Sequence, residues 1–125
     1  MIRVLVAEDD KFLIKAYSSK LKKEGFEAIL AVDGEEAISQ AMAKSPEIIL
    51  LDLVMPKKDG FEVLSELKQS DKTRNIPVVV LSNLGQEEDI DRCKALGADD
   101  YLVKSSISIN DVVEKIREIL AKTKK

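Results

Sequence analysis

The chain has 125 residues, of which 45% are hydrophobic and 34% are charged, and its net charge is -3 at pH 7. This balance suits one globular domain spanning residues 1–125, and no apolar run is long enough to span a bilayer. The acidic charge gives no general attraction to nucleic acid or to anionic membranes. Because the chain begins without a signal-peptide pattern, we expect a cytoplasmic protein.

The residue types that are missing exclude several kinds of chemistry. The sequence contains no histidine and a single cysteine, Cys93. Without an imidazole the chain cannot itself be a phosphohistidine donor, and with one thiol it cannot build a thiolate zinc site. Any metal that it binds should therefore be a hard ion that prefers oxygen ligands.

Short apolar runs alternate with segments of helical spacing along the whole chain. The runs predict five strands, near residues 2–7, 26–31, 47–52, 77–82 and 100–103. The other segments predict five helices, near residues 11–24, 35–44, 60–70, 86–96 and 109–121. This alternation indicates an α/β fold, a doubly wound parallel sheet with helices on both faces.

Several helix features are readable in chain order. The first helix is expected to place four apolar residues on its inner side, Leu13, Ala16, Tyr17 and Leu21. It should end at Gly25 in a left-handed conformation. Cys93 in the fourth helix is interpreted as a small buried or half-buried hydrophobic residue. Ser108 and Asp111 predict a capping box before the last helix, and residues 122–125 are expected to form a frayed tail.

Polar residues follow the predicted strands at four places. Glu8 and Asp9 close the first run, Asp52 closes the third, Ser82 the fourth and Lys104 the fifth. The carboxyl ends of parallel strands form one edge of a sheet, and ligands bind at that edge. Taken singly, each residue also fits an ordinary role such as a turn, a helix cap or an exposed lysine. The coincidence of residue type and strand-end placement at every position favours one shared site.

These residue types suit phosphoryl transfer. Three carboxylates at one edge repel one another unless a divalent cation is present, and Mg2+ accepts carboxylate, water and backbone oxygen ligands. We expect Asp9 and Asp52 to ligate such an ion directly and Glu8 to act through water. A carboxylate can attack phosphorus, while Lys104 neutralises the phosphoryl charge and Ser82 donates a hydrogen bond.

The chain resembles a bacterial response-regulator receiver domain, the family that includes the chemotaxis response regulator. The matching stretches are Val4–Asp10, Leu50–Pro56, Asp59–Gly60, Val79–Ser82 and Gly97–Lys104. They cover essentially the whole chain in the family's order and spacing. The resemblance implies a flavodoxin-like sheet of strand order 2-1-3-4-5 with five helices.

The resemblance also implies the roles of the site residues. Asp52 is the expected phosphoacceptor, Glu8 and Asp9 the acidic pair around Mg2+ or Mn2+, and the Val54 carbonyl a backbone ligand. Lys104 is expected to contact the phosphoryl group. Such a protein is not an enzyme in the ordinary sense, because it catalyses only its own phosphorylation and dephosphorylation.

Ser82 and Tyr101 are the expected switch residues, although Tyr101 also fits plain packing on a short edge strand. The phosphoryl source in this family is a sensor histidine kinase or a histidine phosphotransfer protein, and the output is an unidentified protein target. Direct binding to nucleic acid or membrane is not expected. A phosphorylation-dependent dimer through Lys94, Glu114 and Lys115 is a further expectation.

The sequence departs from the family after Lys104, where Ser105 replaces the usual proline and its cis peptide. A cis bond before a residue other than proline costs about 2.5–4 kcal/mol, so we expect a trans Lys104–Ser105 bond. Asn83 is larger than the usual residue at its position and should narrow access to Asp52. Since Val54 and Leu84 offer no group to orient water, we expect a persistent phosphoryl group.

Two other functions fit the same fold. One is a receiver-like adaptor that binds partners without phosphorylation, which retention of the whole site disfavours. The other is a flavodoxin-like cofactor binder. The sequence has no Gly/Ser/Thr-rich phosphate loop after the first strand, and the acidic pair there would repel a phosphate in the absence of a metal.

Overall fold

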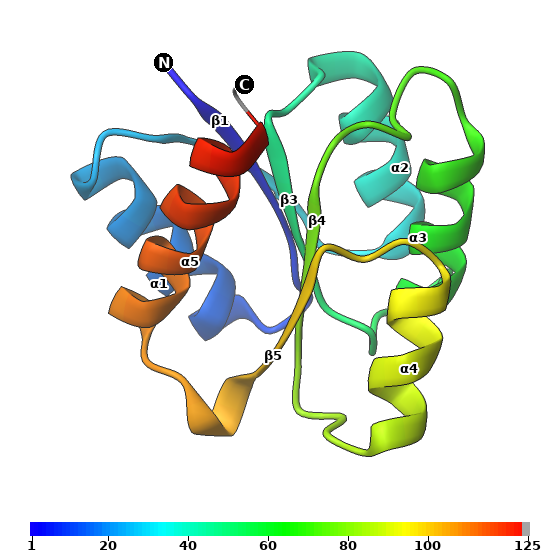
Figure 1. The fold of residues 1–125 in the computed structure, drawn as a ribbon. Coiled ribbons are helices and arrows are strands. Elements are labelled where there is room, and N and C mark those ends of the chain that lie inside the picture. Colours follow the sequence, from blue (N-terminus) through cyan, green and yellow to red (C-terminus); the bar gives the residue numbers. More distant parts are fainter. Residues whose placement is uncertain (124–125) are drawn as a thin grey trace.

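The apolar runs of the sequence form one parallel sheet in the computed structural model, which describes residues 1–123 (Figure 1). The strands are β1 (Arg3–Ala7), β2 (Glu27–Ala31), β3 (Ile48–Leu51), β4 (Val78–Ser82) and β5 (Asp100–Val103). Their order is β2-β1-β3-β4-β5, which confirms the order that the resemblance implied. All four neighbouring pairs are parallel.

Helices connect the strands and follow the last one. They are α1 (Lys11–Lys23), α2 (Gly34–Lys44), α3 (Gly60–Gln69), α4 (Glu87–Ala95) and α5 (Ile109–Thr123). A short 3-10 turn, η1 (Lys104–Ser106), lies between β5 and α5. The predicted bounds differ from these by at most two residues, and those of β5 coincide. Helix α5 runs into the expected tail as far as Thr123, and residues 124–125 lie outside the described part.

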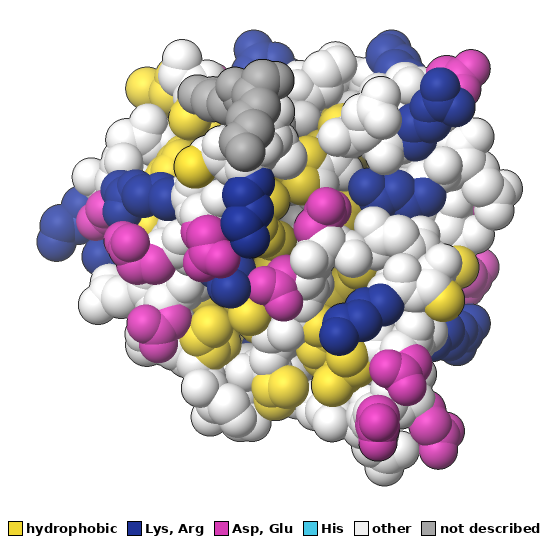
Figure 2. Space-filling model, in the orientation of Figure 1, with side chains coloured by type: hydrophobic (Ala, Val, Ile, Leu, Met, Phe, Trp, Pro, Cys, Tyr) yellow, Lys and Arg dark blue, Asp and Glu magenta, His cyan; other side chains and the backbone are white. Residues whose placement is uncertain are grey.

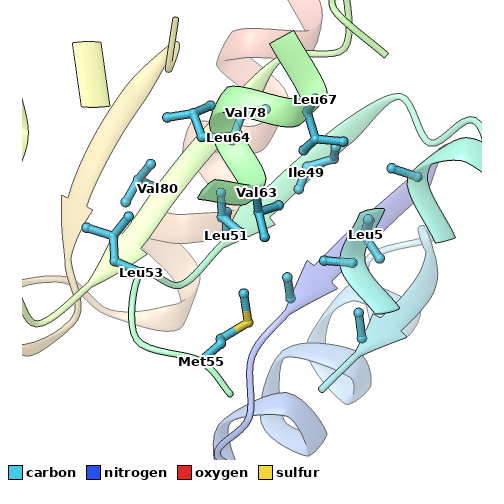
Figure 3. Packing of buried hydrophobic residues seen from close by; sticks show 14 of the residues in the cluster. Leu5, Ile49, Leu51, Leu53, Met55, Val63, Leu64, Leu67, Val78 and Val80 are labelled. Atoms are coloured by element: carbon cyan, nitrogen blue, oxygen red, sulfur yellow. The ribbon is translucent and has the colours of Figure 1, made fainter. Parts of the chain in front are cut away.

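The sheet separates two apolar layers. Helices α1 and α5 cover one face, and α2, α3 and α4 cover the other (Figure 1). Side chains of a strand alternate between the layers, so Leu50 packs on the α1–α5 side and Leu51 on the α3 side. Figure 3 shows the second layer, where Leu51, Val63 and Leu64 converge beneath α3. Burial on both faces explains why β3 and β4 are apolar without alternation.

One predicted core residue lies outside the core. Ala16 is exposed, and the buried residues of α1 are Ile14, Tyr17 and Leu21. Ala16 lies roughly 200° around the helix from Ile14, so it cannot share that side. A small apolar residue loses little by facing water, which is why hydrophobicity alone misplaced it.

The helix ends expected at Gly25 and at Ser108–Asp111 are present, and the start of α1 has a side-chain cap as well. Asp10 caps α1, accepting from the backbone N–H groups of Phe12 and Leu13 at 2.9 and 3.2 Å. Gly25 has a φ of 90°, the left-handed conformation expected after α1. The capping box before α5 is present, with Asp111 N–H donating to Ser108 Oγ at 3.1 Å and Ser108 N–H to Asp111 Oδ2 at 3.4 Å.

The direction of the strands decides where the polar residues meet. Strands β1, β3, β4 and β5 run towards the lower edge in Figure 1, and β2 is parallel to β1. Helix α5 returns to the opposite edge, where β1 begins. The loops that follow the strands therefore gather at one end of the molecule. Within residues 1–123, no helix has both the length and the apolar character that crossing a membrane requires.

Candidate functional site

Backbone hydrogen bonds hold the first acidic residues side by side at the lower edge of the sheet. Glu8 N–H donates to the Ala31 carbonyl at 2.9 Å, and Asp52 N–H donates to the Ala7 carbonyl at 3.0 Å. Glu8 and Asp52 thus extend the strand ladders by one residue beyond β1 and β3. Their positions follow from the parallel register of neighbouring strands.

Glu8, Asp9 and Asp52 form a compact carboxylate cluster. One oxygen from each lies within 4.8 Å of those from the other two. Glu8 and Asp52 are buried, whereas Asp9 is exposed. Burial raises the pKa of Glu8 above its usual range, opposed mainly by its hydrogen bond with Lys104. The cluster therefore concentrates negative charge where water is scarce.

Lys104 places its ammonium group in this cluster. Its Nζ forms an ion pair with Glu8 Oε1 and lies 3.1 Å from Asp52 Oδ2. Burial alone would lower the pKa of Lys104, but the hydrogen bonds and charges of Glu8 and Asp52 outweigh burial and raise it. The lysine is therefore a fixed positive charge beside Asp52.

Both oxygens of Glu8 already have partners in the chain. Oε1 pairs with Lys104, and Oε2 accepts from the Asp10 backbone N–H at 3.1 Å. Asp52 uses Oδ2 for Lys104, and its Oδ1 accepts a long hydrogen bond of 3.4 Å from Val54 N–H. The exposed Asp9 is the most open ligand of the three. That Glu8 acts on a metal through water stays a prediction.

Ser82 and Tyr101 are both linked to the loop after β4. Leu84 N–H donates to Ser82 Oγ at 3.3 Å, and the Tyr101 hydroxyl donates to the Leu84 carbonyl oxygen. Ser82 accepts this bond, so its hydroxyl proton stays available to a further acceptor. Burial raises the pKa of Tyr101 to about 12. Tyr101 is thus neutral at physiological pH, and its hydroxyl donates a hydrogen bond to the loop after β4.

Two residues at the site have contacts that the sequence did not indicate. Tyr17, expected only as a core residue, lines the same tightly filled crevice as Glu8 and Asp52. Asn83, expected to narrow access, accepts a hydrogen bond from Ser105 N–H at 3.0 Å. The helical period places Tyr17 inward but does not give its height relative to the sheet edge. No sequence signal marks the Asn83 contact.

The loop after Lys104 has the expected peptide geometry. Residues 1–123 contain no cis peptide bond, so the Lys104–Ser105 bond is trans. The chain turns there through η1 and still brings Lys104 to Asp52. Ser105 in place of proline therefore does not displace the lysine from the cluster.

The donor set fits a hard divalent cation. Three carboxylates against one ammonium leave two negative charges unbalanced, which equals the charge of one such ion. All the donors are oxygen atoms, as Mg2+ prefers. The residues present therefore suit Mg2+ or Mn2+, and they do not suit a metal that requires imidazole or thiolate.

Comparison with known families decides which protein class this site belongs to. A family model described as the response regulator receiver domain matches residues 4–117. The chain belongs to the response regulator receiver family. Its flavodoxin-like fold and its acidic strand-end cluster are those that the resemblance in the sequence led us to expect.

Curated relatives of this receiver domain include transcriptional regulators. It is 36% identical over 123 residues to the DNA-binding dual master transcriptional regulator RpaA of Synechocystis, covering 98% of this chain and 51% of the relative. It is also 36% identical over 118 residues to the phosphate regulon transcriptional regulatory protein PhoB of Escherichia coli, covering 94% and 51%. The chain thus spans about half the length of the curated relatives it matches.

Solved structures agree with the receiver assignment. The Francisella response regulator 1452 receiver domain superposes with a TM-score of 0.91 at 31% identity, covering 99% of this chain and 100% of that one. A chain of the CheX-CheY-BeF3-Mg complex from Borrelia burgdorferi superposes with a TM-score of 0.86 at 31% identity, covering 94% of this chain and 88% of that one.

The receiver face formed by α4, β5 and α5 carries mixed charges. Figure 2 shows acidic and basic side chains interspersed with apolar ones, and acidic groups over the start of α4. Lys115 Nζ lies 3.0 Å from Asp100 Oδ2 and 3.5 Å from Glu118 Oε2. Glu114 Oε1 accepts from Arg117 at 3.0 Å. Of the three residues expected to support a dimer, Glu114 and Lys115 are therefore already paired within their own chain.

Proposed function

We propose that this receiver domain accepts a phosphoryl group on Asp52 in a magnesium-dependent reaction. The observation that carries the proposal is the buried contact of Asp52 with Lys104 inside a cluster of three carboxylates. A nucleophile, a metal-binding set and a fixed positive charge are therefore within a few ångströms of one another. Phosphoryl transfer depends mainly on such positioning and on charge neutralisation.

In the proposed step, one carboxylate oxygen of Asp52 attacks the phosphorus of a phosphohistidine on a partner protein. A new O–P bond forms as the P–N bond of the donor breaks, and its electron pair leaves with the donor imidazole. The product is an aspartyl phosphate. The donor histidine lies outside residues 1–125, because this sequence has no histidine.

Residues of the chain neutralise and orient the group that is transferred. Lys104 exchanges part of its pairing with Asp52 for one phosphoryl oxygen, which needs little movement because Nζ is only 3.1 Å from Oδ2. Ser82 donates its free hydroxyl proton to a second oxygen. Catalysis of this kind is worth most where water is excluded, and Ser82 is only 1% exposed.

The metal would be held by Asp9 and Asp52 directly, by Glu8 through water, and by the backbone carbonyl of Val54. Bound there, Mg2+ or Mn2+ supplies positive charge that neutralises the phosphoryl oxygens. The relative from Borrelia burgdorferi, solved with BeF3 and Mg, supports this proposal at 31% identity.

A change at Ser82 would reach the rest of the molecule through the loop that it shares with Tyr101. A phosphoryl group that draws the Ser82 hydroxyl inward competes with the Leu84 N–H contact, and Leu84 also holds Tyr101. We propose that this shift alters the face of α4, β5 and α5, to which a protein target or a second copy binds. Several relatives are transcriptional regulators, so an output in gene control is a proposal of the same kind.

Intact-mass measurement after incubation with acetyl phosphate or phosphoramidate tests the central claim. The wild type should gain one phosphoryl group with Mg2+ and none with excess EDTA. Asp52→Asn should gain none under either condition.

Asp71→Asn is the matched control, since the Asp71 side chain is 91% exposed and lies outside the cluster. It should behave as the wild type. An equal gain in Asp52→Asn, or no Mg2+-dependent gain in the wild type from either donor, would contradict the proposal.

A further inference from the structure

We propose that Asn83 is a positioning residue for Lys104, acting through a hydrogen bond between the two loops that carry Ser82 and Lys104. The Ser105 backbone N–H donates to Asn83 Oδ1 at 3.0 Å. This inference rests on the function proposed above, because it concerns how the ammonium group is held beside Asp52.

The bond lies just beyond the end of a strand pair. Strands β4 and β5 are in register up to Ser82 and Val103. Among residues 1–123, no backbone–backbone hydrogen bond joins the segment after Ser82 to the segment after Val103. The Asn83 side chain therefore provides one hydrogen bond between the two segments beyond the last backbone hydrogen bond of the strand pair.

This extra link holds the backbone on both sides of Lys104. Val103 is fixed by the pairing with β4, and Ser105 is fixed by Asn83. A lysine side chain is long and flexible, so its ammonium is well placed only if the chain that carries it is held. With Val103 and Ser105 both tied, Nζ reaches Asp52 Oδ2 at 3.1 Å without a cis peptide bond.

The same hydrogen bond connects the loops that carry the Ser82 hydroxyl and the Lys104 ammonium, the two groups that would contact phosphoryl oxygens. Asn83 directly follows Ser82, and Ser105 directly follows Lys104. The hydrogen bond therefore sets the separation between the loop of the hydroxyl and the loop of the ammonium. Reacting groups held in a fixed relative position lose less entropy on reaching the transition state.

The expected effect is moderate because Asn83 and Ser105 are both exposed. Water can replace a lost hydrogen bond there, so the fold should not depend on it. Removal of the Asn83 acceptor should slow phosphorylation by about three- to tenfold, the range expected for one ordinary hydrogen bond. The melting temperature should stay close to that of the wild type.

The test measures the phosphorylation rate against acetyl phosphate concentration in Mg2+ for four single variants. Asn83→Ala removes the acceptor and should lower the maximal rate more than it changes the half-saturating concentration. Asn83→Asp keeps an oxygen acceptor and should recover part of the rate. Ser105→Ala keeps the N–H and should match the wild type, while Ser105→Pro removes the donor.

The double variant tests whether the effect of Asn83→Ala requires the Ser105 N–H. In the Ser105→Pro background, Asn83→Ala should have no further effect, and Asn83→Asp should no longer exceed Asn83→Ala. Asn75→Ala, an exposed asparagine at the opposite end of β4, should leave the rate unchanged. Amide exchange by NMR gives a readout besides activity, because Ser105 N–H should exchange faster in Asn83→Ala.

The outcomes separate this inference from the function on which it rests. If the wild type gains no phosphoryl group, the proposed function fails. If the wild type is active and Asn83→Ala equals it in rate and in Ser105 exchange, only the positioning role is wrong. If Asn83→Ala lowers the phosphorylation rate by the same factor in the wild type and in the Ser105→Pro variant, the positioning role is also wrong.

Discussion

At the scale of single residues, Lys104 is the side chain on which the carboxylate cluster depends. Its ammonium is the positive charge in contact with both buried carboxylates, Glu8 and Asp52. Burying two carboxylates without a counter-charge is expensive, so the lysine contributes to the fold as well as to the chemistry. A residue that serves both purposes should affect stability and metal binding together.

We expect Lys104→Met to lower the free energy of unfolding by about 2–4 kcal/mol in EDTA, because it leaves two buried carboxylates unpaired. Added Mg2+ should restore part of this loss, and should stabilise the variant more than the wild type, since three negative charges then face the ion. Urea unfolding followed by circular dichroism, with EDTA and with Mg2+, measures both effects.

Lys57→Met is the matched control, because Lys57 also lies near two carboxylates. Its Nζ is 3.7 Å from Asp33 and 3.8 Å from Glu35, but its side chain is 60% exposed. An exposed pair of this kind contributes at most about 1 kcal/mol, and Mg2+ should not alter it. Equal loss of stability in the two lysine variants would contradict the role of Lys104 as the counter-charge of Glu8 and Asp52.

At the scale of elements, α3 begins directly against the loop that carries Asp52. Gly60 N–H, at the start of α3, donates to the Leu53 carbonyl at 2.9 Å. A Cβ at Gly60 would clash with the Asp52 carbonyl oxygen and lie 2.6 Å from Leu53 Cα. Only glycine allows this close approach. The contact holds the loop between β3 and α3 against the start of α3.

Gly60→Ala should therefore destabilise the protein by about 1–3 kcal/mol, as overpacking against backbone usually does. It should also slow phosphorylation, because α3 and the Asp52 loop must move apart. Gly85→Ala is the control, since a Cβ there meets only Val103 methyl groups at 3.7 and 3.8 Å. Equal stability of the two variants in urea unfolding would show that the contact can relax.

At the scale of the whole molecule, two apolar layers share one sheet. Tyr17 lies in the layer under α1 and α5, and Tyr101 packs against the layer under α2, α3 and α4. The strands belong to both layers, so neither can unfold while the other keeps its sheet. The protein should unfold in a single two-state transition.

The two tyrosines report on opposite faces because the chain has no tryptophan. In Tyr101→Phe the fluorescence comes from Tyr17 alone, and in Tyr17→Phe from Tyr101 alone. We expect the fluorescence transition of each variant in urea to coincide with its own transition by circular dichroism. Separate midpoints within either variant would mean that one layer unfolds first.

Much of the fold and the meeting of the site residues could be predicted from the sequence. The strand order and the shared edge follow from alternating periods and from parallel pairing, which do not depend on loop detail. The contact of Lys104 with Glu8 depends on side-chain conformation, and that of Asn83 with Ser105 depends on two irregular loops. Such contacts have no periodic signal, so the structure was needed to find them.

The positions of the start of β1 and the end of α5 have a practical consequence. Strand β1 begins and α5 ends at the edge of the sheet opposite the carboxylate cluster (Figure 1). A label placed before β1 or on the last turn of α5 therefore lies at the end of the sheet away from the loops around Asp52. The domain can be held at that side of the sheet and still present the loops around Asp52 to a partner.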